Sequence, residues 1–176
     1  MSQNTALLLI DVQNGFFNKE FGLYKSEEVL RNITLLHNKA RESNMKIIYI
    51  QHLFGNSIGI QIDGTEMGNI HSNITPKEDD IIIQKKTPNS FYQTNLHNIL
   101  QENEIENLIV AGFQTEFCID TTIREAYSLG YKVILASDAH STFNSELFKA
   151  EDLINYLTYI YSKWFAKLIP TEEINF

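Results

Sequence analysis

The chain has 176 residues, of which 43% are hydrophobic, 20% are charged and only 3 are proline. This composition excludes a disordered or collagen-like state, and the length suits one compact domain, 1–176, better than two. Acidic residues outnumber basic ones by 22 to 14, which gives a formal net charge of -8. A nucleic acid would have to bind against this field, so we expect no such partner.

The first apolar run, Ala6 to Ile10, is ended by Asp11. Crossing a bilayer takes roughly 20 apolar residues, so this run is too short to span one. The residues before it lack the basic region of a secretory signal. We therefore expect a cytoplasmic protein with no membrane partner. Its single cysteine excludes an internal disulfide and a four-cysteine zinc site.

Five short apolar runs predict β-strands. They are too continuous for strands with one wetted face and are typical of strands buried on both faces. A weaker run near 166–169 predicts a sixth strand. The five runs are 6–10, 46–50, 81–83, 108–111 and 132–136.

Segments with helical periodicity separate these strands. Apolar residues recur at three- and four-residue spacing within 29–40, 96–100 and 123–129, and Gly130 is placed to end the third helix. A last helix is expected over 146–163. Alternating strands and helices imply right-handed parallel crossovers. The predicted fold is α/β, a three-layer α/β/α sandwich around an open, Rossmann-like, six-stranded and mostly parallel sheet.

The least regular stretch, Leu53 to Thr75, contains Gly55, Gly59, Gly64 and Gly68 and has no clear period. Loops of this length are usually functional. This one follows the second strand, at the sheet edge where such folds bind ligands. We therefore expect it to shape a substrate site.

Three reactive side chains follow predicted strands: Asp11 after the first, Lys85 after the third and Cys118 shortly after the fourth. The C-terminal ends of parallel strands share one rim, so these groups are expected to meet. A carboxylate can take a thiol proton, the thiol can attack, and an ammonium can hold negative charge. Taken singly, Lys85 and Cys118 have commoner roles, as a solvated lysine and an inert buried thiol, and for Asp11 a turn or helix cap is about as common as catalysis.

Cys118 follows a turn containing Gly112 and stands near the start of an amphipathic helix. Free N–H groups at a helix start stabilise negative charge. We therefore expect them to lower the pKa of the Cys118 thiol and to donate to a developing oxyanion.

Four segments, in order and over nearly the whole chain, resemble the motifs of the isochorismatase-like cysteine hydrolases. The resemblance implies the isochorismatase-like hydrolase fold, with Asp11 as general base, Lys85 as the charge-stabilising lysine and Cys118 as nucleophile. Lys85 is preferred to Lys86 because the family lysine stands six residues before the phenylalanine matched by Phe91. The segments are Leu9–Phe16, Lys85–Phe91 with Thr94 and Leu96, Gly112–Thr122, and Gly130-Tyr131 with Ser137–Ala139.

The resemblance also implies a cis peptide bond between Phe113 and Gln114, just before the nucleophile turn. In the family this bond aims a backbone N–H at the substrate carbonyl oxygen. Here the N–H groups of Gln114 and Cys118 would together form the oxyanion hole.

Two departures from family patterns bear on the substrate. Nicotinamidases carry an Asp-x-His metal set after the second strand, whereas this chain has Gln51-His52 there. His71 could join His52, but two histidines without a placed acid make a poor metal site, so no metal and no cofactor are expected. Asp138, after the fifth strand, is predicted to anchor a loop. Members that cleave the vinyl ether of isochorismate often lack the cysteine, so Cys118 favours an amide-type substrate.

Side chains near the same rim are predicted to line a pocket for a small, flat or partly apolar substrate. For Phe91 and Phe117, a place in the hydrophobic core is an equal alternative. The predicted pocket residues are Gln13, Phe16, His52, Phe54, Phe91 and Phe117. Four aromatic residues on the last helix are too many for a solvated face and predict a homodimer or higher homo-oligomer. They are Tyr156, Tyr159, Tyr161 and Trp164.

Together these features predict a cysteine-dependent hydrolase of a small amide or related C–N bond, acting through a thioester acyl-enzyme. Two alternatives stay open. One is hydrolysis of an isochorismate-type vinyl ether, with Asp11 as acid and base and Cys118 as a bystander. The other is a non-catalytic binding protein on the same fold.

Overall fold

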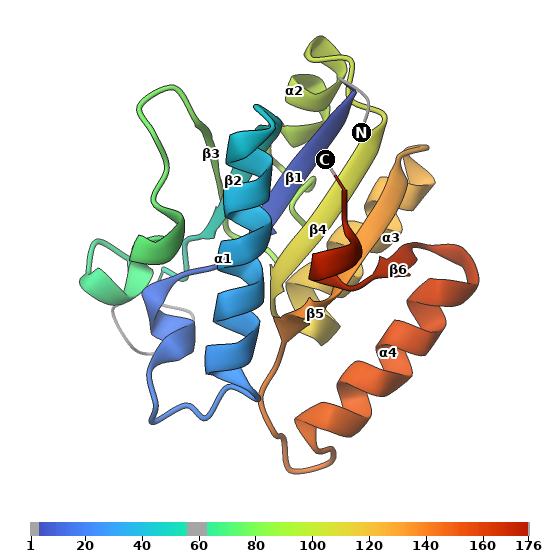
Figure 1. The fold of residues 1–176 in the computed structure, drawn as a ribbon. Coiled ribbons are helices and arrows are strands. Elements are labelled where there is room, and N and C mark those ends of the chain that lie inside the picture. The colour runs from blue at the N-terminus through green and yellow to red at the C-terminus, as the bar shows by residue number, and fades with distance from the viewer. Residues whose placement is uncertain (1–3, 56–62, 176) are drawn as a thin grey trace.

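A computed structural model describes residues 4–55 and 63–175 (Figure 1). The expectation placed on Gly59, within the long loop, lies outside the described residues. Six strands form one sheet in the order β3-β2-β1-β4-β5-β6, and every neighbouring pair is parallel. They are β1 (Thr5–Ile10), β2 (Lys46–His52), β3 (Ile81–Lys85), β4 (Asn107–Phe113), β5 (Lys132–Ser141) and β6 (Lys167–Ile169).

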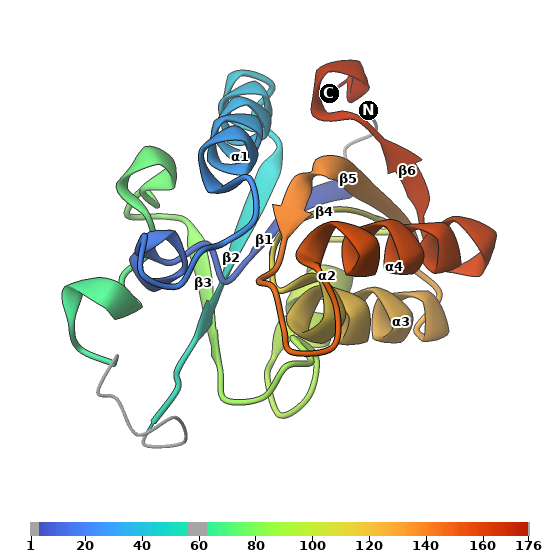
Figure 2. The ribbon, with the colours of Figure 1, turned by 90° about the horizontal axis from the view of Figure 1, so that it is seen from below.

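Within the described residues, four α-helices complete the layers (Figure 2). They are α1 (Ser26–Glu42), α2 (Leu96–Glu102), α3 (Asp120–Ser128) and α4 (Ala150–Trp164). Helix α1 covers one face of the sheet, and α2, α3 and α4 cover the other. The predicted three-layer fold is therefore confirmed. Among the described residues, no helix is long and apolar enough to cross a bilayer.

The strands are apolar throughout because both faces of the sheet are buried. In β1 the residues alternate between two cores: Ala6, Leu8 and Ile10 pack with α2, α3 and α4, whereas Leu7 and Leu9 pack with α1. All five are essentially inaccessible to solvent. The two-residue period of a strand thus supplies both layers from one continuous apolar run.

Two boundaries differ most from the predicted ones. Helix α4 begins at Ala150 rather than 146, because the side chains of Asn144 and Ser145 accept hydrogen bonds from the N–H groups of Ala150 and Phe148. Such side-chain acceptors stabilise a turn in place of a helical start. Strand β5, predicted over 132–136, extends to Ser141 and therefore includes Asp138. Its register against β4 shifts along the way.

The strand order reverses between β1 and β4, and ligands bind at such a switch point in open α/β sheets. The two strands approach closely there, at Gly112, whose φ of +129° is unfavourable for other residues. A Cβ at this position would stand 1.9 Å from the carbonyl oxygen of Ile10. Only glycine fits, and its absence would separate the segments that carry Asp11 and Cys118.

We expect Gly112→Ala to lower the free energy of unfolding by more than about 3 kcal/mol, because backbone must move to admit the methyl group. Gly22→Ala is the matched control, since Gly22 also has a positive φ but no atom within 4 Å of the added carbon. Its cost should be about 1–2 kcal/mol of backbone strain alone. Urea denaturation of both variants measures the difference, and equal losses would contradict the steric account.

Candidate active site

The switch point brings together side chains from four neighbouring strand ends. Asp11 directly follows β1 and adopts a left-handed φ of 54°, a strained conformation of the kind found at functional sites. His52 and Lys85 end β2 and β3 and are partners in the strand register. Cys118 lies beyond β4 on the helical turn η4 (Thr115–Ile119), which leads into α3.

The ammonium group of Lys85 is the centre of this cluster. Its Nζ donates to Asp11 Oδ2 at 2.7 Å and lies 3.2 Å from Cys118 Sγ. It also contacts His52 Nδ1 at 2.9 Å and the carbonyl oxygen of Thr87 at 3.2 Å. The side chains of Lys85 and Asp11 are completely buried. The neighbouring Lys86, the alternative considered from the sequence, is exposed.

Asp11 is ready to accept a proton from one side. Its Oδ2 is held by Lys85, while its Oδ1 is buried and accepts no hydrogen bond from any described residue. Burial raises the pKa of the Asp11 carboxyl, and the positive charge of Lys85 opposes this rise. A carboxylate with a raised pKa is a stronger base than an exposed aspartate.

The Cys118 thiol differs from the sequence expectation. Burial, followed by the charge of Asp11, raises its pKa to about 12, although Lys85 opposes the shift. The predicted lowering by a helix start is wrong, because desolvation and a carboxylate neighbour outweigh the backbone N–H groups. The resting sulfur is therefore a neutral thiol beside a base.

His52 is neutral in this arrangement. Burial and the nearby Lys85 charge lower its pKa to about 4. Its Nδ1 therefore accepts a hydrogen bond from the Lys85 ammonium, which leaves the single ring proton on Nε2.

A metal ion fits this cluster poorly. The candidate ligand atoms of Asp11, His52 and Cys118 all lie within 4.8 Å of one another. The Lys85 ammonium already contacts these three groups and takes the place of a cation among them. His71, the other histidine considered, accepts from Asn73 N–H and packs edge-on to Phe17.

A family model for the isochorismatase domain matches residues 5–173. The chain belongs to the isochorismatase family of hydrolases. It is 33% identical over 174 residues to the isochorismatase family protein YddQ of Bacillus subtilis, covering 98% of this chain and 87% of the relative. It is 28% identical over 162 residues to Nicotinamidase 3 of Arabidopsis thaliana, covering 85% and 79%.

A crystal structure of an isochorismatase from Pseudomonas putida superposes with a TM-score of 0.90 at 30% identity, covering 98% of this chain and 90% of the other. The isochorismatase fold therefore extends over nearly all of the chain.

In this isochorismatase-family chain, contacts from α4 and β5 hold the turn that carries the cysteine. The peptide bond between Phe113 and Gln114 is cis and leads into η4. The Tyr161 hydroxyl, from α4, donates to the carbonyl oxygen of Thr115 at 2.9 Å, and the Thr115 hydroxyl bonds His140 Nδ1 at 3.0 Å. These contacts were not predicted, because they join segments that lie far apart in the chain and no sequence motif links α4 to η4.

Gln13 is buried and hydrogen-bonds the backbone of two neighbouring segments. Its buried amide donates to the carbonyl oxygens of His52 and Gly68 and accepts from His52 N–H. The end of β2 and the turn η2 (Glu66–Gly68) are thereby fixed against β1. Asp138 has the anchoring place predicted for it, since its Oδ1 accepts from both N–H and hydroxyl of Thr171.

Three of the predicted pocket residues lie together in an aromatic cluster. Phe16, on the turn η1 (Asn14–Phe17), has its ring centroid 6.4 Å from that of Phe54, and the Phe54 ring lies 4.5 Å from that of His52. Phe16 also stacks on Phe113 and Phe143. Phe143 was missed, although it follows β5 at the same rim as the other strand ends.

The remaining two predicted pocket residues have different surroundings. Phe91 stacks on Tyr131, 6.0 Å between centroids, and packs against the core that faces α2 and α3. Its core alternative is therefore the one that its contacts support. Phe117, next to the cysteine, is half exposed and so is available at the surface of η4.

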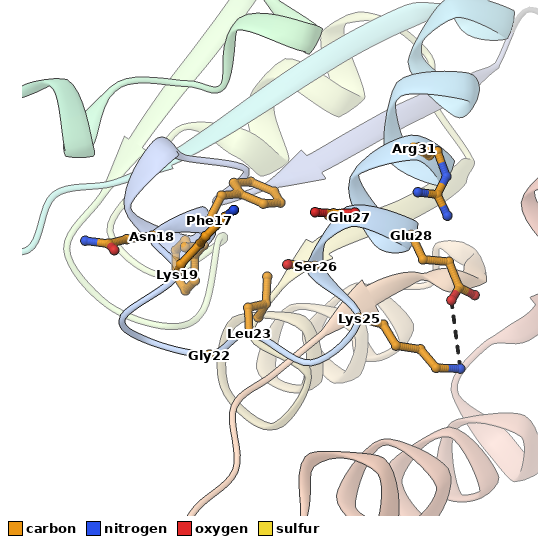
Figure 3. A pocket seen from close by; sticks show the side chains of 11 residues that line it. Phe17, Asn18, Lys19, Gly22, Leu23, Lys25, Ser26, Glu27, Glu28 and Arg31 are labelled. Carbon is orange, nitrogen blue, oxygen red and sulfur yellow. Dashed lines mark ion pairs between the residues drawn. The ribbon is translucent and has the colours of Figure 1, made fainter.

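A hollow of about 490 Å³ lies at the start of α1 (Figure 3). Its lining includes Phe16 and Phe17 and the charged residues Lys25, Glu28 and Arg31. Lys25 and Glu28 pair across its rim at 4.0 Å. Its lining contains none of the Lys85 cluster, so we do not assign the chemistry to it.

The neutral thiol gives a measurable reactivity. Cys118 is the chain's single cysteine, so iodoacetamide reports on it alone. We expect its alkylation rate to rise about tenfold per pH unit from about pH 6 to about pH 9, because the thiolate is a small and growing fraction. The urea-unfolded chain, as control, should react at least roughly 100-fold faster near pH 8. An alkylation rate of the folded protein that levels off below about pH 9 would contradict the raised pKa of Cys118.

Proposed function

We propose that this protein hydrolyses a small amide or related C–N bond through a thioester on Cys118. The observation that carries the proposal is the position of Lys85 Nζ, within hydrogen-bond distance of both Asp11 Oδ2 and Cys118 Sγ. One ammonium thus holds a base and a nucleophile side by side in a buried site. That arrangement suits acyl transfer to sulfur.

In the first step, the Cys118 thiol proton passes to Asp11 while the sulfur attacks the substrate carbonyl carbon. Oδ1 of Asp11 is the acceptor, since Oδ2 is held by Lys85. Because the resting thiol has a pKa of about 12, proton transfer accompanies attack rather than preceding it. The C–N bond then breaks, and the amine leaves with the proton from Asp11.

The oxyanion of this step would be held by the backbone N–H groups of Gln114 and Cys118. Gln114 directly precedes the turn η4, which carries the sulfur. A donor of this kind lowers the barrier by about 3 kcal/mol in acyl-transfer enzymes.

In the second step, water attacks the thioester carbon and gives a proton to Asp11. The C–S bond breaks, the acid product leaves, and the proton returns to sulfur. Lys85 keeps Asp11 ionised between the steps and stabilises negative charge near the sulfur. In this scheme Phe16, His52 and Phe54 form an aromatic wall suited to a small, flat substrate.

The amide reaction is favoured over vinyl-ether hydrolysis and over a non-catalytic role. A bystander cysteine would need neither an adjacent base nor an ammonium contact, and both are present. Among the similar proteins, Nicotinamidase 3 is an amidase by name. We also propose a cytoplasmic location, which the single cysteine supports.

The test is a panel of small primary amides, carbamoyl compounds and isochorismate, assayed with the wild type and with Cys118→Ala. We expect turnover of an amide or carbamoyl compound and a loss of kcat/KM of at least roughly 10³-fold in the variant, because no acyl acceptor remains. Intact-mass spectrometry of the quenched wild type should show one acyl adduct, absent from Cys118→Ala.

Cys118→Ser is the control for side-chain volume. It replaces the thiol by a hydroxyl, which is still a nucleophile, and should retain more activity than the alanine variant. Full turnover of the substrate by Cys118→Ala would contradict covalent catalysis. Turnover of isochorismate alone, equal in both proteins, would favour the vinyl-ether alternative.

A further inference from the structure

Helix α4 presents large aromatic side chains to solvent. Tyr156 is 63% exposed, Tyr159 58% and Trp164 73%. Tyr161 was expected among them but is fully buried, because its hydroxyl donates to Thr115 behind the cysteine turn. Figure 1 shows α4 at the edge of the molecule near β6. Its outward face is thus separate from the face that supports the active site.

Four of the exposed residues of α4 form one stripe along the helix. Asp152, Tyr156, Tyr159 and Lys163 are spaced by four, three and four residues, which places them on one side of the helix. Asp152 lies at the N-terminal end, the tyrosines in the middle and Lys163 at the C-terminal end. The Lys163 Nζ lies 4.5 Å from the centre of the Tyr159 ring.

This stripe is complementary to itself. The midpoint between Asp152 and Lys163 and the midpoint between Tyr156 and Tyr159 both fall between Leu157 and Thr158. If a second copy of α4 crosses antiparallel about a two-fold axis at that point, each aspartate faces a lysine and each Tyr156 faces a Tyr159. A two-fold interface requires this reciprocity.

We infer that α4 pairs antiparallel with α4 of a second copy of this chain to form a homodimer. The ends of the helix support the same occupant. Leu147, 84% exposed, and Phe148 precede α4, and Trp164 ends it. An antiparallel pair brings the apolar start of one helix to the tryptophan end of the other and extends the apolar contact along the whole helix.

Charge favours the antiparallel orientation over other arrangements of the two copies. The chain carries a formal net charge of -8, so two copies repel each other in most orientations. The stripe carries one acid and one base, and the antiparallel orientation places opposite charges together. Within one helix, Asp152 and Lys163 are eleven residues, or about 16 Å, apart and are therefore too distant to pair with each other.

The test is a charge exchange followed by sedimentation velocity at matched concentrations. The wild type should sediment as a dimer of the 20.3-kDa chain. Lys163→Glu and Asp152→Lys each place like charges across the axis, and we expect each to weaken dimerisation at least roughly tenfold. The double variant Asp152→Lys with Lys163→Glu restores opposite charges across the axis and should recover the dimer.

Lys132→Glu, which changes an exposed lysine at the start of β5, is the control and should leave the dimer unchanged. Tyr156→Ala and Tyr159→Ala, checked for folding by circular dichroism, should also dissociate it. A monomeric wild type, or a dimer that neither single charge change weakens, would overturn the inference. Failure of the exchange to restore association would also overturn the antiparallel arrangement.

Discussion

A buried ammonium group is the constraint on which the site depends. Taking Lys85 and Asp11 out of water costs several kcal/mol per ion, and only close contact between them, with further hydrogen bonds, offsets that cost. The strand register supplies those contacts by setting Lys85 beside His52 and across from Asp11. Loss of one partner would leave the other charge buried and unpaired.

The same ammonium decides the chemistry of its neighbours. It takes the place of a cation among Asp11, His52 and Cys118. Burial, together with the charge of Lys85, lowers the pKa of His52 and keeps it neutral as a hydrogen-bond acceptor. The ammonium does not ionise the thiol, since burial and Asp11 outweigh it. The site is therefore one in which a neutral thiol gives up its proton at the moment of attack. As Asp11 takes this proton and loses its negative charge, the oxyanion that develops on the substrate becomes the negative charge facing Lys85.

Much of this arrangement could be predicted from the chain alone. Continuous apolar runs identify strands buried on both faces, and the parallel-strand rule then brings Asp11, Lys85 and Cys118 to one rim. The direction of the pKa shift of the Cys118 thiol could not be predicted, because it depends on how deeply the sulfur is buried. The hydrogen bond from the Tyr161 hydroxyl to Thr115, and those between Gln13 and His52 at the end of β2, were missed for a related reason. They depend on contacts between segments far apart in the chain.

A double-mutant cycle of Asp11→Asn and Lys85→Met measures the central interaction most directly. Urea denaturation would give the free energy of unfolding for the wild type, both single variants and the double variant, with Lys86→Met as an exposed control. We predict that each single variant loses about 3 kcal/mol or more, and that the double variant loses less than the sum by at least about 2 kcal/mol. Losses that simply add would show that the two charges do not depend on each other, and would contradict the account.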